Sequence, residues 1–590
     1  MKPGGIRRPM FSSAALVLWC VALAILIRWP LSYYLWALPL DSNISLHILA
    51  AQDLHRTGDP LTLSSLSFPD AIPFRMLAWP TVLVASWLET WMSPVRSMNV
   101  ALVLLVAVQG LAMAALGRTL GWNVWQRLAA ATAVEAAPVT VTLLANSQVE
   151  NLAFFAFCLV VWGVKRGGPP GWLSVLGGLV LAGYSSPYQA VPAALLVVTM
   201  ALGRGVRALV LAGATSVLAA VLVGVYFSGA ILDGARPASG PRRSVPVWDA
   251  ANAKALLIPN QQPLDPQHDV SDLLSPAARW QAVTHRPPVV EVHIDWHAYP
   301  PWRVSYLGIV LVAAGLGGLW VGRKDRTTRA VAAAGAVCLV LSFAPHAGLV
   351  ERLGREGVGA ASWGAILEPV LYMRSPVRFL TATCFALALG VGHLVGKWRP
   401  LGTLALMAGL MADSLLLAPG TWPPRCVYPD VHALEQRLNQ GPIAVWPPFH
   451  SEYITAFQVL AVTTGRRLGI CEPTVATRDA VPDRLWKGLL TIAPPPEPHS
   501  SSPPPRASSS TGRTTAEWLR QLYDAGATVL VELLPEPEVT PPLSVLDPTR
   551  LGLRGAPTCF PGYCLWDLAT QLEPAAPSPE PDGDLVIRCR

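Results

Sequence analysis

Long apolar runs constrain this chain more than any other feature of its sequence. Leu, Val and Ala fill these runs, and 52% of the 590 residues are hydrophobic. Only 14% are charged, whereas soluble domains carry about 25% charged residues. Helices that face lipid need almost no charge. The sequence therefore predicts an integral membrane protein with several spans.

About eleven apolar segments are candidates for membrane-spanning helices, which need roughly 20 residues each. The segments at 151–164 and 172–186 fall short of that length, so the number carries a margin of about one or two. A further stretch, 74–92, is interrupted by a proline and a glutamate, and we interpret it as helices on the membrane surface. The expected fold is an all-α polytopic transmembrane bundle over 1–418. Its spans are expected near 11–28, 98–117, 127–145, 151–164, 172–186, 189–203, 208–229, 304–321, 328–344, 379–396 and 401–418.

Basic residues cluster in the short turns between these segments, so we interpret the net charge of +7 as topology and not as nucleic-acid binding. With a cytoplasmic N-terminus, each cytoplasmic turn carries at least two of them, as the positive-inside rule requires. We therefore predict a multi-pass protein of the inner (plasma) membrane with its N-terminus in the cytoplasm. The residues are Arg7 and Arg8, Arg118 and Arg127, Lys165 and Arg166, Arg204 and Arg207, Arg323 to Arg329, and Lys397 and Arg399.

Three large segments fall on the external side in this topology: 29–97, 230–303 and 419–590. The last is predicted as a small periplasmic or extracellular α/β domain with a disordered Pro- and Ser-rich loop at 494–513. Its strands are expected at 441–447, 525–533 and 562–567, and its helices at 432–439 and 515–525. Disulfides are allowed there, and the available cysteines are Cys426, Cys471, Cys559, Cys564 and Cys589.

An acidic residue follows the first predicted span, at the membrane surface. Asp41 is well placed to take the proton from a hydroxyl that attacks a lipid-borne phosphate sugar, or to hold a divalent cation against a diphosphate. It is equally well placed to cap the helix expected through His47. The sequence leaves both roles open.

Two polar turns interrupt the apolar sequence on the same side. Asn146, Gln148 and Glu150 lie between the third and fourth predicted spans, and Tyr188 follows Pro187 between the fifth and sixth. Polar residues at a membrane boundary either line a site or turn the chain. Turn chemistry accounts for Asn146 and for a hairpin at Pro187, but less easily for Gln148 and Glu150.

Two arginines, Arg374 and Arg378, precede the tenth predicted span on the external side, against the positive-inside bias. A bound phosphate is one explanation, because a guanidinium group contacts phosphate with two hydrogen bonds at once. Snorkelling toward anionic headgroups is the other.

Two further groups of ionisable residues have chemical interest. In an extended segment, His293, Asp295 and His297 would share one face and suit a divalent metal, although the spacing supplies no fourth ligand. Glu135 and Asp413 lie inside predicted spans. Intramembrane carboxylates suggest function, but a hydrogen bond to a neighbouring helix would also satisfy them.

The order and placement of these motifs resemble those of bacterial polytopic membrane proteins of the GT-C glycosyltransferase type, including the YfhO-like proteins and their relatives. The long helical core and the external α/β domain also fit, so the resemblance covers most of the chain. One departure is that Ser42 and Asn43 follow Asp41, where many such enzymes have a second acid. The matching pieces are Asp41 with His47, Gly58-Asp59-Pro60, Asn146 to Asn151, Ser185 to Tyr188 and Arg374 to Phe379.

The resemblance implies transfer of a sugar from a polyprenyl-phosphate donor to an envelope glycan or lipid acceptor on the external face. Asp41 would be the catalytic base or metal ligand, and Arg374 and Arg378 would hold the donor phosphate. The resemblance identifies no cofactor with certainty and leaves open whether a divalent cation, Mg²⁺ or Mn²⁺, takes part. The residues that would shape the sugar or acceptor pocket are His47, Asn146, Gln148, Glu150 and Tyr188.

Two other functions fit the same residues. A transporter or flippase for a lipid-linked saccharide would use the polar groups for binding alone. A non-catalytic assembly protein would bind envelope polymers through its external domain. Replacement of Asp41 by Ala separates glycosyl transfer from transport, and truncation after about residue 418 identifies the assembly protein.

Overall fold

A computed structural model describes most of the apolar part of the chain and a smaller share of the rest. The chain divides into two compact units. The first comprises Met1–Pro39, Leu77–Tyr226 and Ala238–Cys426, and the second comprises Leu40–Met76, Phe227–Pro237 and Val427–Arg590. The described residues are 8–28, 38–39, 42–59, 62–63, 72–73, 78–145, 148–234, 256, 306–342, 376–417, 426–427, 442–446, 468–469, 515–533, 553–560 and 563–572.

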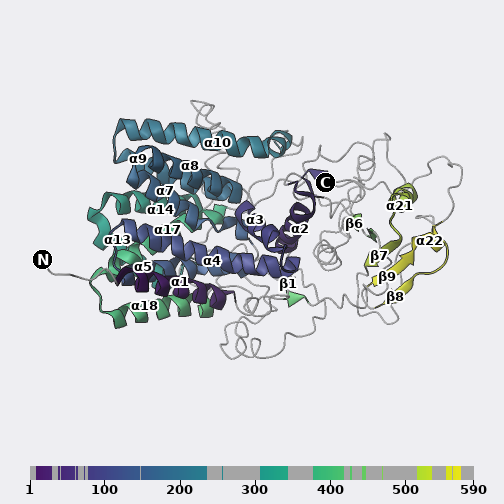
Figure 1. Cartoon of the computed structure of the whole chain (residues 1–590), viewed down its shortest axis with the longest axis horizontal. Helices are drawn as coiled ribbons and strands as arrows, with labels where there is room; N and C mark the ends of the chain where they lie inside the picture. Colours follow the sequence, from purple (N-terminus) through teal and green to yellow (C-terminus); the bar gives the residue numbers. More distant parts are fainter. Residues whose placement is uncertain are drawn as a thin grey trace, which may run out of the picture. The chain divides into compact units, whose positions relative to one another are not determined.

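The first unit is a bundle of helices that run side by side (Figure 1). Several of them begin with proline, which is tolerated in the first turn because the N–H groups there have no helical partner. Examples are Pro94, Pro138, Pro187 and Pro400. The helical elements of this part of the chain are α1 (Arg8–Ile27), α3 (Trp79–Leu88), α4 (Pro94–Thr119), α5 (Val124–Glu135), α6 (Pro138–Ala145), η1 (Val149–Asn151), α7 (Phe154–Arg166), α8 (Gly168–Ser185), α9 (Pro187–Leu202), α10 (Val206–Gly234), α13 (Ile309–Val321), η4 (Gly322–Lys324), α14 (Arg326–Ser342), η5 (Pro376–Phe379), α17 (Leu380–Leu394), η6 (Val395–Lys397), α18 (Pro400–Ala412) and η7 (Asp413–Leu417).

Helix α17 forms the centre of the bundle, since every residue from 380 to 392 is buried. Glycines allow α13 to pass very close to it. A Cβ atom on Gly318 would lie 1.7 Å from the carbonyl oxygen of Gly390, and one on Gly390 would lie 2.1 Å from that of Gly315. Side chains are excluded at this crossing, which is a common way for membrane helices to pack.

Helices α5 and α6 form one apolar stretch that bends by 43°. The bend precedes Pro138, which cannot donate a backbone hydrogen bond. Thr140 donates its hydroxyl to the Val134 carbonyl at 2.8 Å, and Ser414 donates to the Ala136 carbonyl. These side chains satisfy carbonyl groups that the bend releases, as an apolar surrounding requires.

Three described helices are long and apolar enough to cross a membrane, namely Pro94–Thr119, Val206–Tyr226 and Val377–Leu394, and the bent pair adds a fourth if it forms one span. Helices occupy each predicted span, but the others are shorter or less apolar, so the number of about eleven crossings stays a prediction. Helix α3 lies within 74–92, and its placement on the membrane surface is likewise a prediction. Apolar exposure is clearest on α10, where the residues more than half exposed are Val206, Val210, Val217, Val221 and Val225.

The second unit contains a mixed five-stranded sheet of order β6-β5-β7-β9-β8. Strand β5 runs parallel to β6 and β7, whereas β9 is antiparallel to β7 and β8. The elements of the sheet and its helices are β5 (Ile443–Trp446), β6 (Leu468–Gly469), α21 (Thr515–Asp524), β7 (Val529–Leu533), β8 (Thr558–Phe560), β9 (Tyr563–Asp567) and α22 (Leu568–Gln571). The remaining short elements of the chain are β1 (Leu38–Pro39), α2 (Ser42–Thr57), β2 (Thr62–Leu63), β3 (Ile72–Pro73) and β4 (Cys426–Val427).

Several predictions for the C-terminal segment can be compared with this sheet. Strands β5, β7 and β9 and helix α21 lie within the segments predicted as strands and helix. The helix predicted at 432–439 and the loop predicted at 494–513 lie outside the described residues. Cys564 is disulfide-bonded, and Cys559 is opposite it in the β8–β9 register.

Candidate functional site

Six predicted site residues lie outside the described part of the chain, so their roles stay predictions. They are Asp41, Asn146, His293, Asp295, His297 and Arg374. Within the described ranges, no group of three or more His, Cys, Asp and Glu side chains could hold a metal ion. The predicted residues that are described are Gln148, Glu150, Tyr188 and Arg378 in the first unit and His47 in the second.

The short 3₁₀ turn η1 carries the acidic residue of the candidate site. Glu150 is buried there, and Asn151 donates from Nδ2 to its Oε1 at 3.0 Å. The buried amide of Gln109 in α4 fixes the end of this turn, since it donates to the Leu152 carbonyl at 2.9 Å and accepts from the Phe155 N–H at 2.8 Å. Side-chain hydrogen bonds therefore hold the turn at the start of α7.

The α8–α9 turn lies against η1. Ser186 is the N-cap of α9: its Oγ accepts from the N–H of Tyr188 at 3.3 Å and donates to Asn151 Oδ1 at 3.2 Å. Pro187 occupies the first helical position, so this turn has the chemistry of a normal helix start. The predicted Pro-terminated hairpin is thus present, and its cap also bonds the candidate site.

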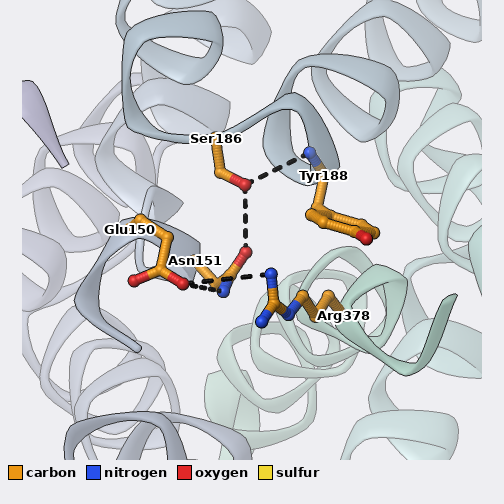
Figure 2. Close-up of polar contacts among 5 residues, drawn as sticks. All are labelled: Glu150, Asn151, Ser186, Tyr188 and Arg378. Carbon is orange, nitrogen blue, oxygen red and sulfur yellow. Dashed lines mark hydrogen bonds and ion pairs between the residues drawn. The ribbon is translucent and has the colours of Figure 1, made fainter. Parts of the chain in front are cut away.

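Arg378 brings a positive charge to the same place from η5 (Figure 2). Its Nη1 lies 3.9 Å from Glu150 Oε1, and its side chain is 19% exposed. Its guanidinium carbon lies 4.8 Å from the centre of the Tyr188 ring. The structure therefore assembles Glu150, Tyr188 and Arg378 from three separate segments.

Burial shifts the pKa of the Glu150 carboxyl. Loss of solvent raises the pKa of its carboxyl above the ordinary value of 4.5, although Arg378 and the hydrogen bond from Asn151 act in the opposite direction. The carboxylate is thus incompletely compensated by the described residues. An additional hydrogen-bond donor would stabilise its charged form.

Four buried polar atoms around this cluster have no hydrogen-bond partner among the described residues. Unpaired buried polar groups are costly and uncommon. Here they include acceptors and donors on neighbouring segments, next to an aromatic ring and a cation. This is the composition of a site for a hydroxylated, anionic ligand. The atoms are Gln148 Oε1, Glu150 Oε2, Gln189 Nε2 and Arg378 Nε.

Gln189 and Thr381 were not predicted as individual site residues. Gln189 is fully buried, and its Oε1 lies 3.2 Å from Thr381 Oγ1, which is also 3.0 Å from the Arg378 carbonyl oxygen. The side chain of Gln189 is thereby held beside Thr381 in the first turn of α17. The position of Gln189 directly after Pro187 and Tyr188 was a signal in the sequence that could have identified it. Its partner, Thr381, lies too far away in the sequence to be predicted.

His47 lies in α2 of the second unit and is buried. Burial lowers the pKa of its imidazole to about 4 from an ordinary 6.5. It is therefore neutral near pH 7, when one ring nitrogen can accept a hydrogen bond. Its role in a sugar or acceptor pocket stays a prediction.

Asp413, which lies inside a predicted span, has a structural role. Its Oδ2 accepts from the Val310 N–H at 2.8 Å, and its Oδ1 accepts from the Tyr306 hydroxyl at 2.5 Å. Asp413 therefore caps the start of α13 from a distant segment. The hydrogen bond to a neighbouring helix, one of the two explanations considered above, accounts for this carboxylate.

Comparisons with known proteins add little to this geometry. Neither a protein-family model nor a curated protein matches the chain. Among solved structures, it is similar to the archaeal oligosaccharyltransferase AglB from Archaeoglobus fulgidus, in complex with an inhibitory peptide and a dolichol-phosphate: 10% identity, 90% of this chain, 70% of that chain and a TM-score of 0.41. It is also similar to ArnT from Cupriavidus metallidurans in the apo state: 13% identity, 94% of this chain, 98% of that chain and a TM-score of 0.35. Scores this low do not establish a common fold.

Proposed function

We propose that the chain is a membrane glycosyltransferase of the GT-C type, which transfers a sugar from a polyprenyl-phosphate donor to an envelope glycan or lipid on the external face. The observation that carries the proposal is the cluster around Arg378. A cation, a carboxylate, two amides and an aromatic ring lie there, and four buried polar atoms have no hydrogen-bond partner among the residues that the structure describes. The protein also has apolar helices long enough to cross a membrane, which supports access to a lipid-linked substrate.

Each group has a role that follows from its chemistry. Arg378 binds the donor phosphate and stabilises the negative charge that develops on it as the sugar leaves. Glu150, Gln148 and Gln189 exchange hydrogen bonds with sugar hydroxyls. Tyr188 holds the guanidinium over its ring and offers an apolar face to the sugar.

Two residues outside the described part complete the proposed reaction. Asp41 removes the proton from the acceptor hydroxyl as that oxygen attacks the sugar, and the bond between the sugar and the phosphate breaks. The donor's lipid phosphate leaves with the electron pair of that bond. Arg374 is a second phosphate ligand. A divalent cation, Mg²⁺ or Mn²⁺, would lower the charge of the phosphate when bound.

The test is sugar transfer from a panel of radiolabelled polyprenyl-phosphate monosaccharides in proteoliposomes that contain envelope glycans and lipids as acceptors. We expect transfer by the wild type, and loss of transfer with donor binding retained in Asp41→Asn. Arg399→Gln removes an exposed charge outside the cluster and should leave transfer unchanged. Movement of labelled donor across the bilayer without transfer would instead identify a flippase, and undiminished transfer in Asp41→Asn would remove Asp41 from the chemistry.

A further inference from the structure

The basic turns of the helical bundle come together at one end of it. His393, near the end of α17, has the ring of Trp122 from the α4–α5 turn at 5.2 Å. A Cβ atom on Gly322, after α13, would lie 2.9 Å from the His393 ring. Arg204, after α9, donates to the carbonyl of Lys165 at the end of α7 at 3.1 Å. Because Arg378 precedes α17, this end lies roughly 20 Å from the candidate site.

The turn between α13 and α14 is the most strongly charged part of this end. Asp325 is its only acid, and that carboxylate already accepts from the Thr328 N–H at 2.9 Å and the Thr328 hydroxyl at 2.8 Å. Within the described ranges, no ion pair neutralises the exposed cations of the turn. These cations are Arg323, Lys324, Arg326 and Arg329.

An apolar strip lies directly beneath these charges. The guanidinium carbon of Arg323 is 3.9 Å from the centre of the Trp320 ring, and Trp320 is 69% exposed. Leu316 and Val321 on the same helix are 57% and 58% exposed. These groups match the parts of a phospholipid. The cation suits the phosphate, the exposed tryptophan suits the interface, and the exposed aliphatic side chains suit the acyl chains.

We propose that this turn and the helix ends that flank it, residues 316–329, form a binding site for an anionic phospholipid. Arg323 contacts the phosphate, Trp320 lies at the level of the headgroup, and Leu316 and Val321 contact the acyl chains. Free phosphate or nucleic acid would use the cations but would leave the apolar strip uncovered, so the strip favours a lipid. The proposal does not depend on glycosyl transfer, because it concerns the other end of the bundle.

The full-length protein in detergent tests this site by native mass spectrometry with equal amounts of phosphatidylglycerol and phosphatidylcholine. We expect the wild type to retain phosphatidylglycerol preferentially, and Arg323→Gln to reduce that binding roughly fivefold. Trp320→Ala should reduce it while the charge is unchanged. Arg323→Lys should retain part of the binding, because it keeps the charge and loses the planar stack.

The matched control is Arg520→Gln, which removes a cation 5.6 Å from the ring of Tyr523 in α21. It lowers the net charge by the same amount and should leave lipid retention unchanged. Equal retention in wild type and Arg323→Gln would overturn the proposal, as would an equal loss in Arg520→Gln. Displacement of the lipid by millimolar inorganic phosphate would show a simple anion site and would overturn it too.

Discussion

Arg378 and Glu150 approach to 3.9 Å although they belong to segments far apart in the chain. At this distance the two side chains form an ion pair but no direct hydrogen bond. Glu150 Oε1 accepts a hydrogen bond from Asn151 instead, at 3.0 Å. The contacts therefore hold both charged groups in place, and each group still has an atom that can form a hydrogen bond with a ligand. An arginine held in this way has little conformational freedom to lose when it binds phosphate.

Removal of the arginine should cost more stability than removal of both charges. Arg378→Ala leaves the Glu150 carboxylate buried without its cation, and we expect a loss of roughly 2 kcal/mol in the free energy of unfolding. Adding Glu150→Gln to that variant should restore most of the loss, because the amide carries no charge and can still bond Asn151. Unfolding of the wild type and these two variants in detergent measures this. Equal losses in the single and double variants would mean that the ion pair has no part in the effect.

The raised pKa of Glu150 predicts a pH dependence with a definite sign. An acid whose pKa is higher in the folded protein binds more protons there, so its contribution to stability is complete below the ordinary pKa of 4.5 and is lost as pH rises through the folded value. Glu150→Gln should remove this contribution. The difference in unfolding free energy between wild type and Glu150→Gln, followed from pH 4 upward, should change in favour of the variant. A difference that is constant with pH contradicts the raised pKa.

The α13–α17 crossing offers a test with an internal control. A methyl group on Gly318 would meet the Gly390 carbonyl oxygen at 1.7 Å, whereas one on Gly317 meets only a Leu394 side-chain carbon, at 3.8 Å. We expect Gly318→Ala to destabilise the protein by about 3 kcal/mol and Gly317→Ala to have little effect. Thermal unfolding of the two variants decides the matter, and similar unfolding temperatures would show that the helices can separate at little cost.

The cap on α13 should be sensitive to the carboxylate that forms it. Asp413→Ala removes the acceptor for the Val310 N–H and the Tyr306 hydroxyl, and we expect a loss of about 2 kcal/mol. Tyr306→Phe removes only one of these bonds and should cost less. Unfolding in detergent checks the order. Equal losses in the two variants would mean that the bond to the Val310 N–H, and with it the cap, contributes nothing.

Local sequence patterns predicted the elements better than their partners. Apolar runs mark the helices, and short apolar segments bounded by turns mark β5, β7 and β9, because burial of one segment leaves a signature in its own residues. Position relative to the predicted spans also singled out Glu150 and Arg378. The structure places these two side chains 3.9 Å apart, and their roles in a site stay predictions.

The contacts themselves were not predictable from one sequence. Asp413 and Tyr306 form a hydrogen bond across 107 positions, and Gln189 and Thr381 across 192. Such pairs depend on how the helices pack, and the local sequence around each residue does not determine that packing. Gly318 lies in an apolar run, but its close contact with Gly390 exists only once α13 lies against α17.

The most direct test of the central claim is equilibrium binding of a polyprenyl-phosphate sugar to the purified protein, compared among wild type, Arg378→Gln and Arg399→Gln. We predict that Arg378→Gln weakens binding by roughly 10- to 100-fold, the value of one or two charge-assisted hydrogen bonds, and that Arg399→Gln binds as the wild type does. Binding of the uncharged polyprenol should be weak in all three. Equal affinity of wild type and Arg378→Gln for the phosphate sugar would contradict the account, because the cluster would then not hold the donor.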